Sequence, residues 1–181
     1  RSVVLLLELS AFAPRRCLDG SGLITSGGVT RGTTVLFVDL AGFTVLTESL
    51  SHYGSRGTEQ LSNIVSAFFG EVTREVLTRG GDPVAYGGDA LTITFDGSPE
   101  DGLQRAAGAA EEIHRLTELA TSRTSLAGTV SLTARIGIAS GSVSTAVAST
   151  NQRAIPVHVG TGLDDAVTAE EEATGGQTIF S

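Results

Sequence analysis

The chain has 181 residues, which is enough for one domain with a substantial buried core. Its formal net charge is −8 and all twelve basic residues are arginine. This composition argues against a nucleic-acid partner, because phosphate backbones are bound mainly through cationic patches, and it excludes lysine-dependent chemistry. The single Cys17 excludes an internal disulfide, and the apolar run from Val3 to Leu7 is too short to cross a bilayer. We expect a cytoplasmic protein without a membrane segment and, because no methionine begins it, a piece of a longer one.

The first part of the chain carries no obvious site. Residues 5–15 are expected to form a short helix or strand, and residues 18–32, with five glycines, to form a loop. Residues 33–38 are apolar without alternation, which is typical of a strand buried on both faces. We therefore divide the chain into an N-terminal extension, residues 1–32, and one domain, residues 33–181.

A helix and a hairpin are expected next. Apolar residues recur at a spacing of three and four from Leu61 to Val76, which predicts a helix with one face on a sheet. Leu91, Ile93 and Phe95 alternate with threonines after the turn at residues 86–90. This alternation predicts a strand that returns from a β-hairpin.

The remaining residues predict two helices and several strands. In order, these are a helix over 99–119, a strand over 130–138, a turn at 140–142, a return strand over 143–147, a strand over 155–159, a helix over 160–173 and a strand through 179–180. On the last helix, residues 170–172 are three glutamates that we expect on a solvated face. The order fits an α+β fold, a ferredoxin-like sandwich with a mostly antiparallel sheet and helices packed on one face.

Two aspartates stand at places suited to a metal site. Asp39 ends the apolar run of residues 35–38, and the helix start expected after it would offer free backbone N–H groups to a polyphosphate. Asp89 lies in the expected hairpin turn. Hard divalent cations prefer oxygen ligands. Two such carboxylates, if they converge, would support metal-assisted chemistry on a nucleoside triphosphate.

The segments around both aspartates resemble the paired metal-binding motifs of class III adenylyl and guanylyl cyclases. The matching stretches are Phe37 to Thr44 and Gly80 to Ala90, followed in register by Ala134 to Gly141 and Val159 to Ser181. Two short motifs in the right order are a strong signal, although either aspartate alone would be weak. The resemblance covers roughly residues 30 to 181 and implies the class III cyclase fold.

The resemblance also implies a site. In that family two metal ions, Mg²⁺ or Mn²⁺, bind between the two aspartates, and the substrate's 3′-hydroxyl attacks its own α-phosphate and expels pyrophosphate. Here Asp39 and Asp89 would hold both ions, and the Leu40 carbonyl would add a ligand. The terminal phosphates of ATP would lie against the backbone amides of Ala41, Gly42, Phe43 and Thr44.

Three positions depart from a complete cyclase site. Ala85 replaces the lysine that reads adenine, and Asp164 and Thr168 replace the asparagine and arginine of the closing segment. Class III sites lie between two cyclase domains. We therefore predict that this chain is the metal-binding half of an adenylyl cyclase and converts ATP to cyclic AMP with a second cyclase domain, in tandem or in trans. The isolated chain is predicted to be inactive or nearly so.

A narrower resemblance concerns the first cyclase domain of soluble, bicarbonate-responsive adenylyl cyclases. Residues 56–61, 80–82, 88–91 and 159–165 carry it. In that group a lysine and an arginine help to bind bicarbonate, and Ala85 and Val167 stand at the corresponding positions. The sequence therefore argues against bicarbonate regulation through this domain.

Other interpretations of the same residues remain open. An Asp before a helix is often an N-cap, and an Asp in a Gly-Gly-Asp turn often serves local hydrogen bonding. A catalytically dead pseudo-cyclase, acting as a regulatory nucleotide-binding or dimerisation module, would keep the same fold. A diguanylate cyclase or polymerase-palm relative would also pair carboxylates, but Ala90 and Leu91 spoil the first signature and the acidic charge disfavours the second.

The choice between ATP and GTP is open, because the base would be read by the second domain. A partner surface near both aspartates and residues 140–147 predicts weak homodimers of the isolated chain.

Overall fold

The computed structural model describes residues 18–19, 22–23, 28–121, 124–126, 128–129, 131–149 and 154–181. The element expected over residues 5–15 lies outside this range. Two short strands, β1 (Leu18–Asp19) and β2 (Gly22–Leu23), pair antiparallel. The loop prediction for residues 18–32 is therefore wrong at both ends. β1 and β2 lie in its first part, and residues 28–32 already belong to strand β3 (Gly28–Ala41) and pair with β8 despite their glycines.

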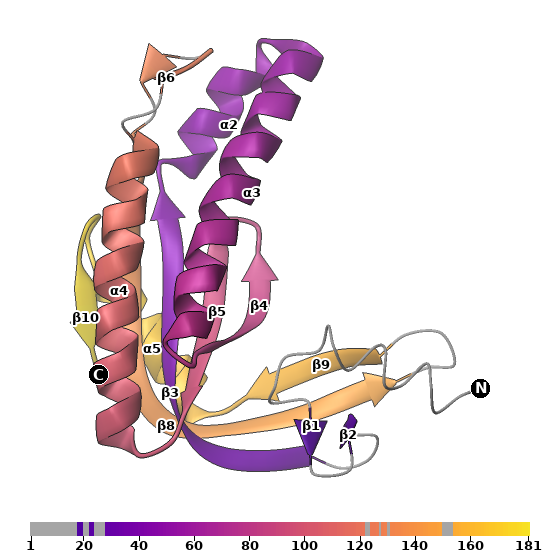
Figure 1. Ribbon diagram of the computed structural model, residues 1–181, viewed down its shortest axis with the longest axis vertical. Coiled ribbons are helices and arrows are strands. Elements are labelled where there is room, and N and C mark those ends of the chain that lie inside the picture. Colours follow the sequence, from indigo (N-terminus) through magenta and orange to yellow (C-terminus); the bar gives the residue numbers. More distant parts are fainter. Residues whose placement is uncertain are drawn as a thin grey trace.

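A six-stranded sheet forms the centre of the fold (Figure 1). Besides β3, its strands are β4 (Asp82–Gly87), β5 (Ala90–Asp96), β8 (Thr133–Ser149), β9 (Ala154–Val159) and β10 (Thr178–Phe180). The order is β10-β8-β3-β5-β4, with β9 paired to the outer half of β8. In this sheet β10 is parallel to β8 and the other pairings are antiparallel. The prediction of a mostly antiparallel sheet is therefore confirmed.

Helices cover both faces of this sheet. The helices are α2 (Phe43–Ser51), α3 (Gly54–Thr78), α4 (Pro99–Thr121) and α5 (Thr161–Glu172), and two short strands, β6 (Thr124–Ser125) and β7 (Gly128–Thr129), follow α4. Alternate side chains of β3 lie on opposite faces of the sheet. Leu36, Val38 and Leu40 pack in the core with α3 and α4, whereas Val35 and Phe37 pack with α5. The α+β fold class is confirmed, but the helices are not confined to one face as expected.

The helices predicted from apolar spacing are confirmed in α3 and α4. In α3, Phe68, Val72 and Val76 are at most 7 % exposed and face the sheet. Ala106 and Ile113 of α4 are fully buried in the same core. Figure 1 shows these two helices side by side in front of the sheet, and α5 behind it. The hairpin of β4 and β5 is also confirmed.

Strand β8 continues without a break through residues 140–142, where the sequence predicted a turn. Those residues pair with residues 32–34 of β3. The prediction rested on the turn-forming composition Ser-Gly-Ser, and the long ladder with β3 overrides that local preference. The hairpin lies later, between β8 and β9. As a result, the outer ends of β3 and β8 project with β9 as an arm, away from the helices (Figure 1).

Two glycines of β8 bring α5 into direct backbone contact with the sheet. A Cβ at Gly137 would lie 2.0 Å from the carbonyl oxygen of Ala166, and one at Gly141 would lie 2.5 Å from the amide nitrogen of Gly162. No side chain tolerates such distances, so α5 lies at this depth because both positions are glycine. This close packing fixes the distance between α5 and the sheet, and with it the position of the α5 side chains that face the sheet.

Arg105 connects α4, on which it lies, with the chain just after α3 and with the end of β5. Its guanidinium donates hydrogen bonds to the backbone carbonyls of Gly80, at 3.2 Å, and of Asp96. It also lies 5.7 Å from the ring centroid of Phe95 and pairs with Asp101 at 2.8 Å. Arg105 thereby supplies donors to carbonyls just after α3 and at the end of β5.

Arg105→Ala is expected to lower the free energy of unfolding by about 1–2 kcal/mol, because these carbonyls lose a charged donor. Urea denaturation followed by circular dichroism measures the change. The matched control is Arg115→Ala. Arg115 lies on the same helix and pairs with Glu112 at the surface, where ion pairs contribute little. Equal losses in the two variants would contradict the role given to Arg105.

Candidate functional site

Asp39 lies near the C-terminal end of β3, where the chain leads into α2. In the ladder it stands opposite Ala90 of β5 on one side and Arg135 of β8 on the other. By the alternation of β3, its side chain is on the α5 face of the sheet. The carboxylate is 22 % exposed, so it is accessible from outside without being fully hydrated.

Asp89 lies in the tight turn between β4 and β5, as predicted. Gly88 precedes it with a φ of 70°, a left-handed conformation that favours glycine. The turn reaches β3 directly, since the carbonyl of Asp89 accepts a hydrogen bond from the N–H of Leu40 at 3.3 Å. The structure therefore brings Asp89 beside the Asp39–Leu40 segment, from a separate part of the sequence.

The N-terminus of α2 follows immediately. Gly42 is its N-cap residue with a φ of 91°, and a Cβ there would lie 2.3 Å from the carbonyl oxygen of Ser131, so the position requires glycine. No side chain caps this helix end. The first N–H groups of a helix have no partner within it, so those of Phe43 and Thr44 suit an anion. The ring of Phe43 does not take part in this anion site, because it packs against the hydrophobic core.

An ion cluster joins Asp39 to two residues that were not expected to take part in the site. One guanidinium nitrogen of Arg135, Nη2, lies 2.6 Å from Oδ2 of Asp39 and 2.9 Å from Oε1 of Glu170 on α5. Glu170 is 4 % exposed, so the expectation that it lies on a solvated face is wrong. Its neighbours Glu171 and Glu172 are exposed as expected.

Arg135 and Glu170 of this cluster shift each other's pKa values. The hydrogen bond to Asp39 raises the pKa of Arg135 above its ordinary value, and the charges of Glu170, Asp39 and Asp89 act in the same direction. Burial raises the pKa of Glu170, while the nearby charge of Arg135 opposes that effect. Three carboxylates from β3, the β4–β5 turn and α5 therefore act on one guanidinium.

The sequence did contain signals for both missed residues. Arg135 interrupts an alternating strand on the face opposite Ala134 and Ile136, which signals a charge on the second face of the sheet. Glu170 follows Gly162 and Ala166 at steps of four, so it continues the stripe of small residues on α5. That stripe is the buried side of the helix, and Glu170 lies at its end.

The residues present fit a divalent cation. Asp39 and Asp89 supply carboxylate oxygens, the ligands that such ions prefer, although Asp39 is paired with Arg135 in this structure. Within the residues that the structure describes, no three His, Cys, Asp or Glu side chains gather into a complete ligand set. Backbone carbonyls, water or phosphate oxygens would therefore have to complete the coordination.

The three positions that depart from a complete cyclase site lie at the surface. Ala85 is exposed on β4, at the edge of the sheet. Asp164 and Thr168 are exposed on α5, where the hydroxyl of Thr168 donates a hydrogen bond to the carbonyl of Asp164 at 2.9 Å. All three residues are thus accessible to solvent.

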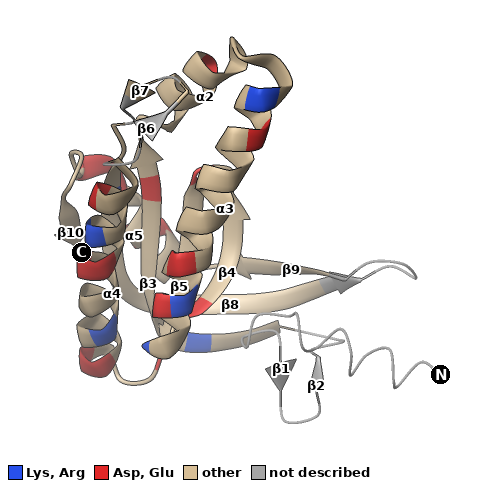
Figure 2. Ribbon diagram, turned by 45° about the horizontal axis from the view of Figure 1, so that its top comes forward, with Lys and Arg blue, Asp and Glu red and all other residues tan. Residues whose placement is uncertain are grey.

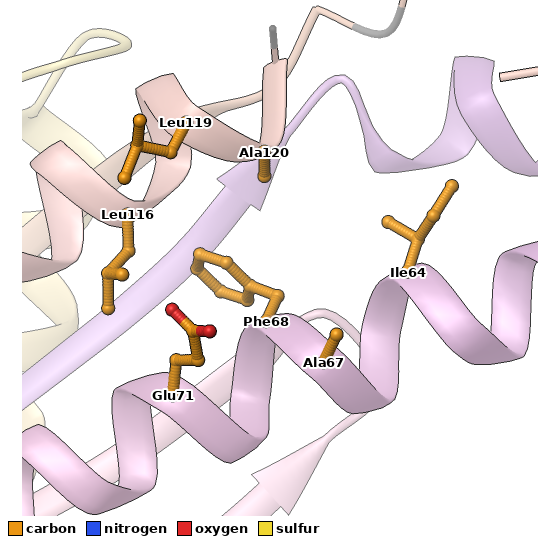
Figure 3. A pocket seen from close by; sticks show the side chains of 7 residues that line it. All are labelled: Ile64, Ala67, Phe68, Glu71, Leu116, Leu119 and Ala120. Atoms are coloured by element: carbon orange, nitrogen blue, oxygen red, sulfur yellow. The ribbon is translucent and has the colours of Figure 1, made fainter. Parts of the chain in front are cut away.

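A shallow groove lies elsewhere, between α3 and α4 (Figure 3). Its lining is mostly apolar, and Glu71 adds a carboxylate. The lining residues are Ile64, Ala67, Phe68 and Glu71 of α3 and Leu116, Leu119 and Ala120 of α4. Because α3 and α4 cover the face of the sheet opposite Asp39, this groove is separate from the two aspartates.

Charged residues are distributed over most elements of the described chain (Figure 2). Figure 2 shows arginines placed singly on helices and strands, among more numerous acidic residues. None of the described helices combines the length and the apolarity that a bilayer crossing requires.

Comparison with known proteins gives a consistent result. Adenylate cyclase type 10 of Mus musculus is 28 % identical over 185 aligned residues, which cover 97 % of this chain and 10 % of the relative. The same enzyme of Oryctolagus cuniculus is 30 % identical over 81 % of this chain and 9 % of the relative. The chain thus spans about a tenth of the length of these relatives. No family model matches it.

A solved structure extends the likeness to three dimensions. The guanylyl cyclase Cya2 superposes with a TM-score of 0.72 at 26 % identity, over 86 % of this chain and 77 % of Cya2. Both the sequence and the fold therefore relate this chain to the catalytic domains of class III nucleotide cyclases.

Proposed function

We propose that this chain is the metal- and phosphate-binding half of a composite class III cyclase that converts ATP to cyclic AMP and pyrophosphate. The observation that carries the proposal is the hydrogen bond between Leu40 and Asp89, which places two carboxylate-bearing segments next to each other at the start of α2. The likeness to adenylate cyclase type 10 favours ATP over GTP. We assign the cyclase homology domain to residues 33–181 together with the first residues of β3, and the chain to the first of two cyclase domains.

Each residue of the site has a separate task in this proposal. Asp39 and Asp89 would hold two ions, Mg²⁺ or Mn²⁺, and the Leu40 carbonyl would add an oxygen. Bound there, the ions would supply a lowered pKa for the attacking 3′-hydroxyl and neutralise charge on the phosphates. The backbone N–H groups of residues 41–44 would hold the terminal phosphates, because the start of a helix attracts anions.

The second cyclase domain would complete the site. Ala85 offers no amine to the base, and Thr168 offers no cation to a developing phosphate charge. Exposed apolar side chains on the arm support a partner surface: Ile155, Val157 and Val159 of β9 are between 44 % and 58 % exposed. Without a partner, such a patch would support weak homodimers of the chain. We further propose that the complex of the two domains works in the cytoplasm.

The test is reconstitution. The chain is mixed with a cyclase domain that carries the lysine, asparagine and arginine missing here, and cyclic AMP is measured with Mn²⁺ and ATP. We expect product from the mixture and little or none from either domain alone. Full activity of this chain alone would refute the composite site, and a mixture without activity would refute a catalytic role.

A pseudo-cyclase is the second candidate, and one observation favours it. Asp39 is already paired with Arg135, so its charge is satisfied without a metal. As a regulatory nucleotide-binding or dimerisation module, the chain would leave the rate of the assembly independent of Asp39.

A further inference from the structure

We propose that Arg135 is a counter-ion of Asp39 that a divalent cation must displace. In this proposal Glu170 is a positioning residue that sets how strongly Arg135 binds Asp39. The inference rests on the proposed function, because it treats Asp39 as a metal ligand. It goes further by giving two residues outside the aspartate motifs opposite effects on metal binding.

The geometry shows a shared nitrogen. Nη2 of Arg135 contacts both Asp39 and Glu170, at 2.6 and 2.9 Å. The contact with Asp39 is a hydrogen bond, whereas Oε1 of Glu170 has no partner in hydrogen-bonding geometry among the described residues. The attraction to Glu170 is therefore mainly one of charge, and the two carboxylates compete for one cationic group.

Burial explains why Arg135 stays in place. The side chain of Glu170 is 5 % exposed, and a buried carboxylate without a cationic partner is strongly unfavourable. The depth of α5, fixed by Gly137, holds Glu170 against the sheet. When a metal takes over Asp39, Arg135 can therefore turn toward Glu170 and keep a full ion pair. Glu170 thus favours the arrangement in which Asp39 is free for the metal.

Opposite predictions follow for two uncharged replacements. Arg135→Gln removes the competing cation, so the chain should bind Mn²⁺ about tenfold more tightly, which corresponds to the loss of one charge-assisted hydrogen bond. Glu170→Gln keeps the shape but removes the alternative anion. Arg135 then pairs with Asp39 alone, and Mn²⁺ should bind several-fold more weakly.

The double variant separates this coupling from a simple effect of charge. If Glu170 acts through Arg135, then adding Glu170→Gln to Arg135→Gln should change Mn²⁺ affinity no further. If Glu170 attracts the metal directly, the second substitution should weaken binding in either background. Arg135→Lys provides a rescue, because it restores the cation and should return the affinity toward that of the wild type.

The experiment is a titration of the full chain with Mn²⁺ alone, followed by electron paramagnetic resonance of free Mn²⁺. Circular dichroism confirms that each variant is folded. Tighter binding by Arg135→Gln, weaker binding by Glu170→Gln and no further change in the double variant would support the proposal. Mn²⁺ binding that is lost in Asp39→Asn but unchanged in Arg135→Gln and Glu170→Gln would overturn this inference while leaving the proposed function intact. No Mn²⁺ binding to the wild type or to Arg135→Gln would overturn this inference, whereas the proposed function is tested separately by the reconstitution with the second domain and ATP.

Discussion

Asp39→Ala should lower the rate of cyclic AMP formation by the assembled two-domain enzyme by a factor of about 100 to 1,000, the usual cost of losing one electrostatic contact to the reacting groups. The physical reason is that alanine offers no oxygen to a cation and leaves Arg135 paired with Glu170 alone. The measurement is the initial rate with Mn²⁺ and ATP at saturating partner domain. Asp39→Asn, which keeps the shape of the side chain, should lose most of the same rate.

The matched control is Glu111→Ala, which removes an exposed carboxylate from α4, on the face of the sheet opposite Asp39. Its rate should equal that of the wild type. An assembly that keeps its full rate with Asp39→Ala would contradict a catalytic role and would favour the pseudo-cyclase.

Gly137→Ala should lower the free energy of unfolding by about 3 kcal/mol, at the upper end of the usual cost of overpacking. The added methyl group would lie 2.0 Å from the carbonyl oxygen of Ala166 and 2.4 Å from the backbone nitrogen of Glu170. Both are backbone atoms, so the whole of α5 has to move. Urea denaturation measures the loss, and a changed Mn²⁺ affinity would report the accompanying shift of Glu170.

The control for this substitution is Gly70→Ala, the same chemical change on the exposed side of α3. A Cβ there meets nothing within 4 Å. Since alanine favours helix over glycine, this variant should gain up to about 1 kcal/mol. A similar stability for the two variants would show that α5 is not held by close backbone packing.

The secondary structure was predicted correctly where apolar residues recur with a regular period. It was predicted wrongly where the prediction rested on local Gly and Ser content. The stripe from Leu61 to Val76 and the alternation around Ile93 each reflect one buried face, and a single buried face determines the secondary structure. The Ser-Gly-Ser segment at residues 140–142 was mispredicted, because its local turn preference is weaker than the ladder with β3. The early start of β3 at Gly28 has the same cause, since ladder partners are invisible in local composition.

The candidate site was predictable in part. The motifs around Asp39 and Asp89 pointed to two segments that the fold does bring together. Glu170 was missed because three consecutive glutamates suggest a solvated face, whereas a helix turns each of them to a different side. Arg135 was missed because all helices were expected on one face of the sheet, which left no buried partner for a charge on the other.

The ladder between β3 and β8 has a consequence for the opposed charges of Asp39 and Arg135. All 14 residues of β3 are paired with β8. A slip of one residue would turn each side chain of a strand to the wrong face, so the whole length of the two strands resists it. The alignment of carboxylate and guanidinium is therefore set by the register of the whole ladder, and not only by the contact between the two side chains.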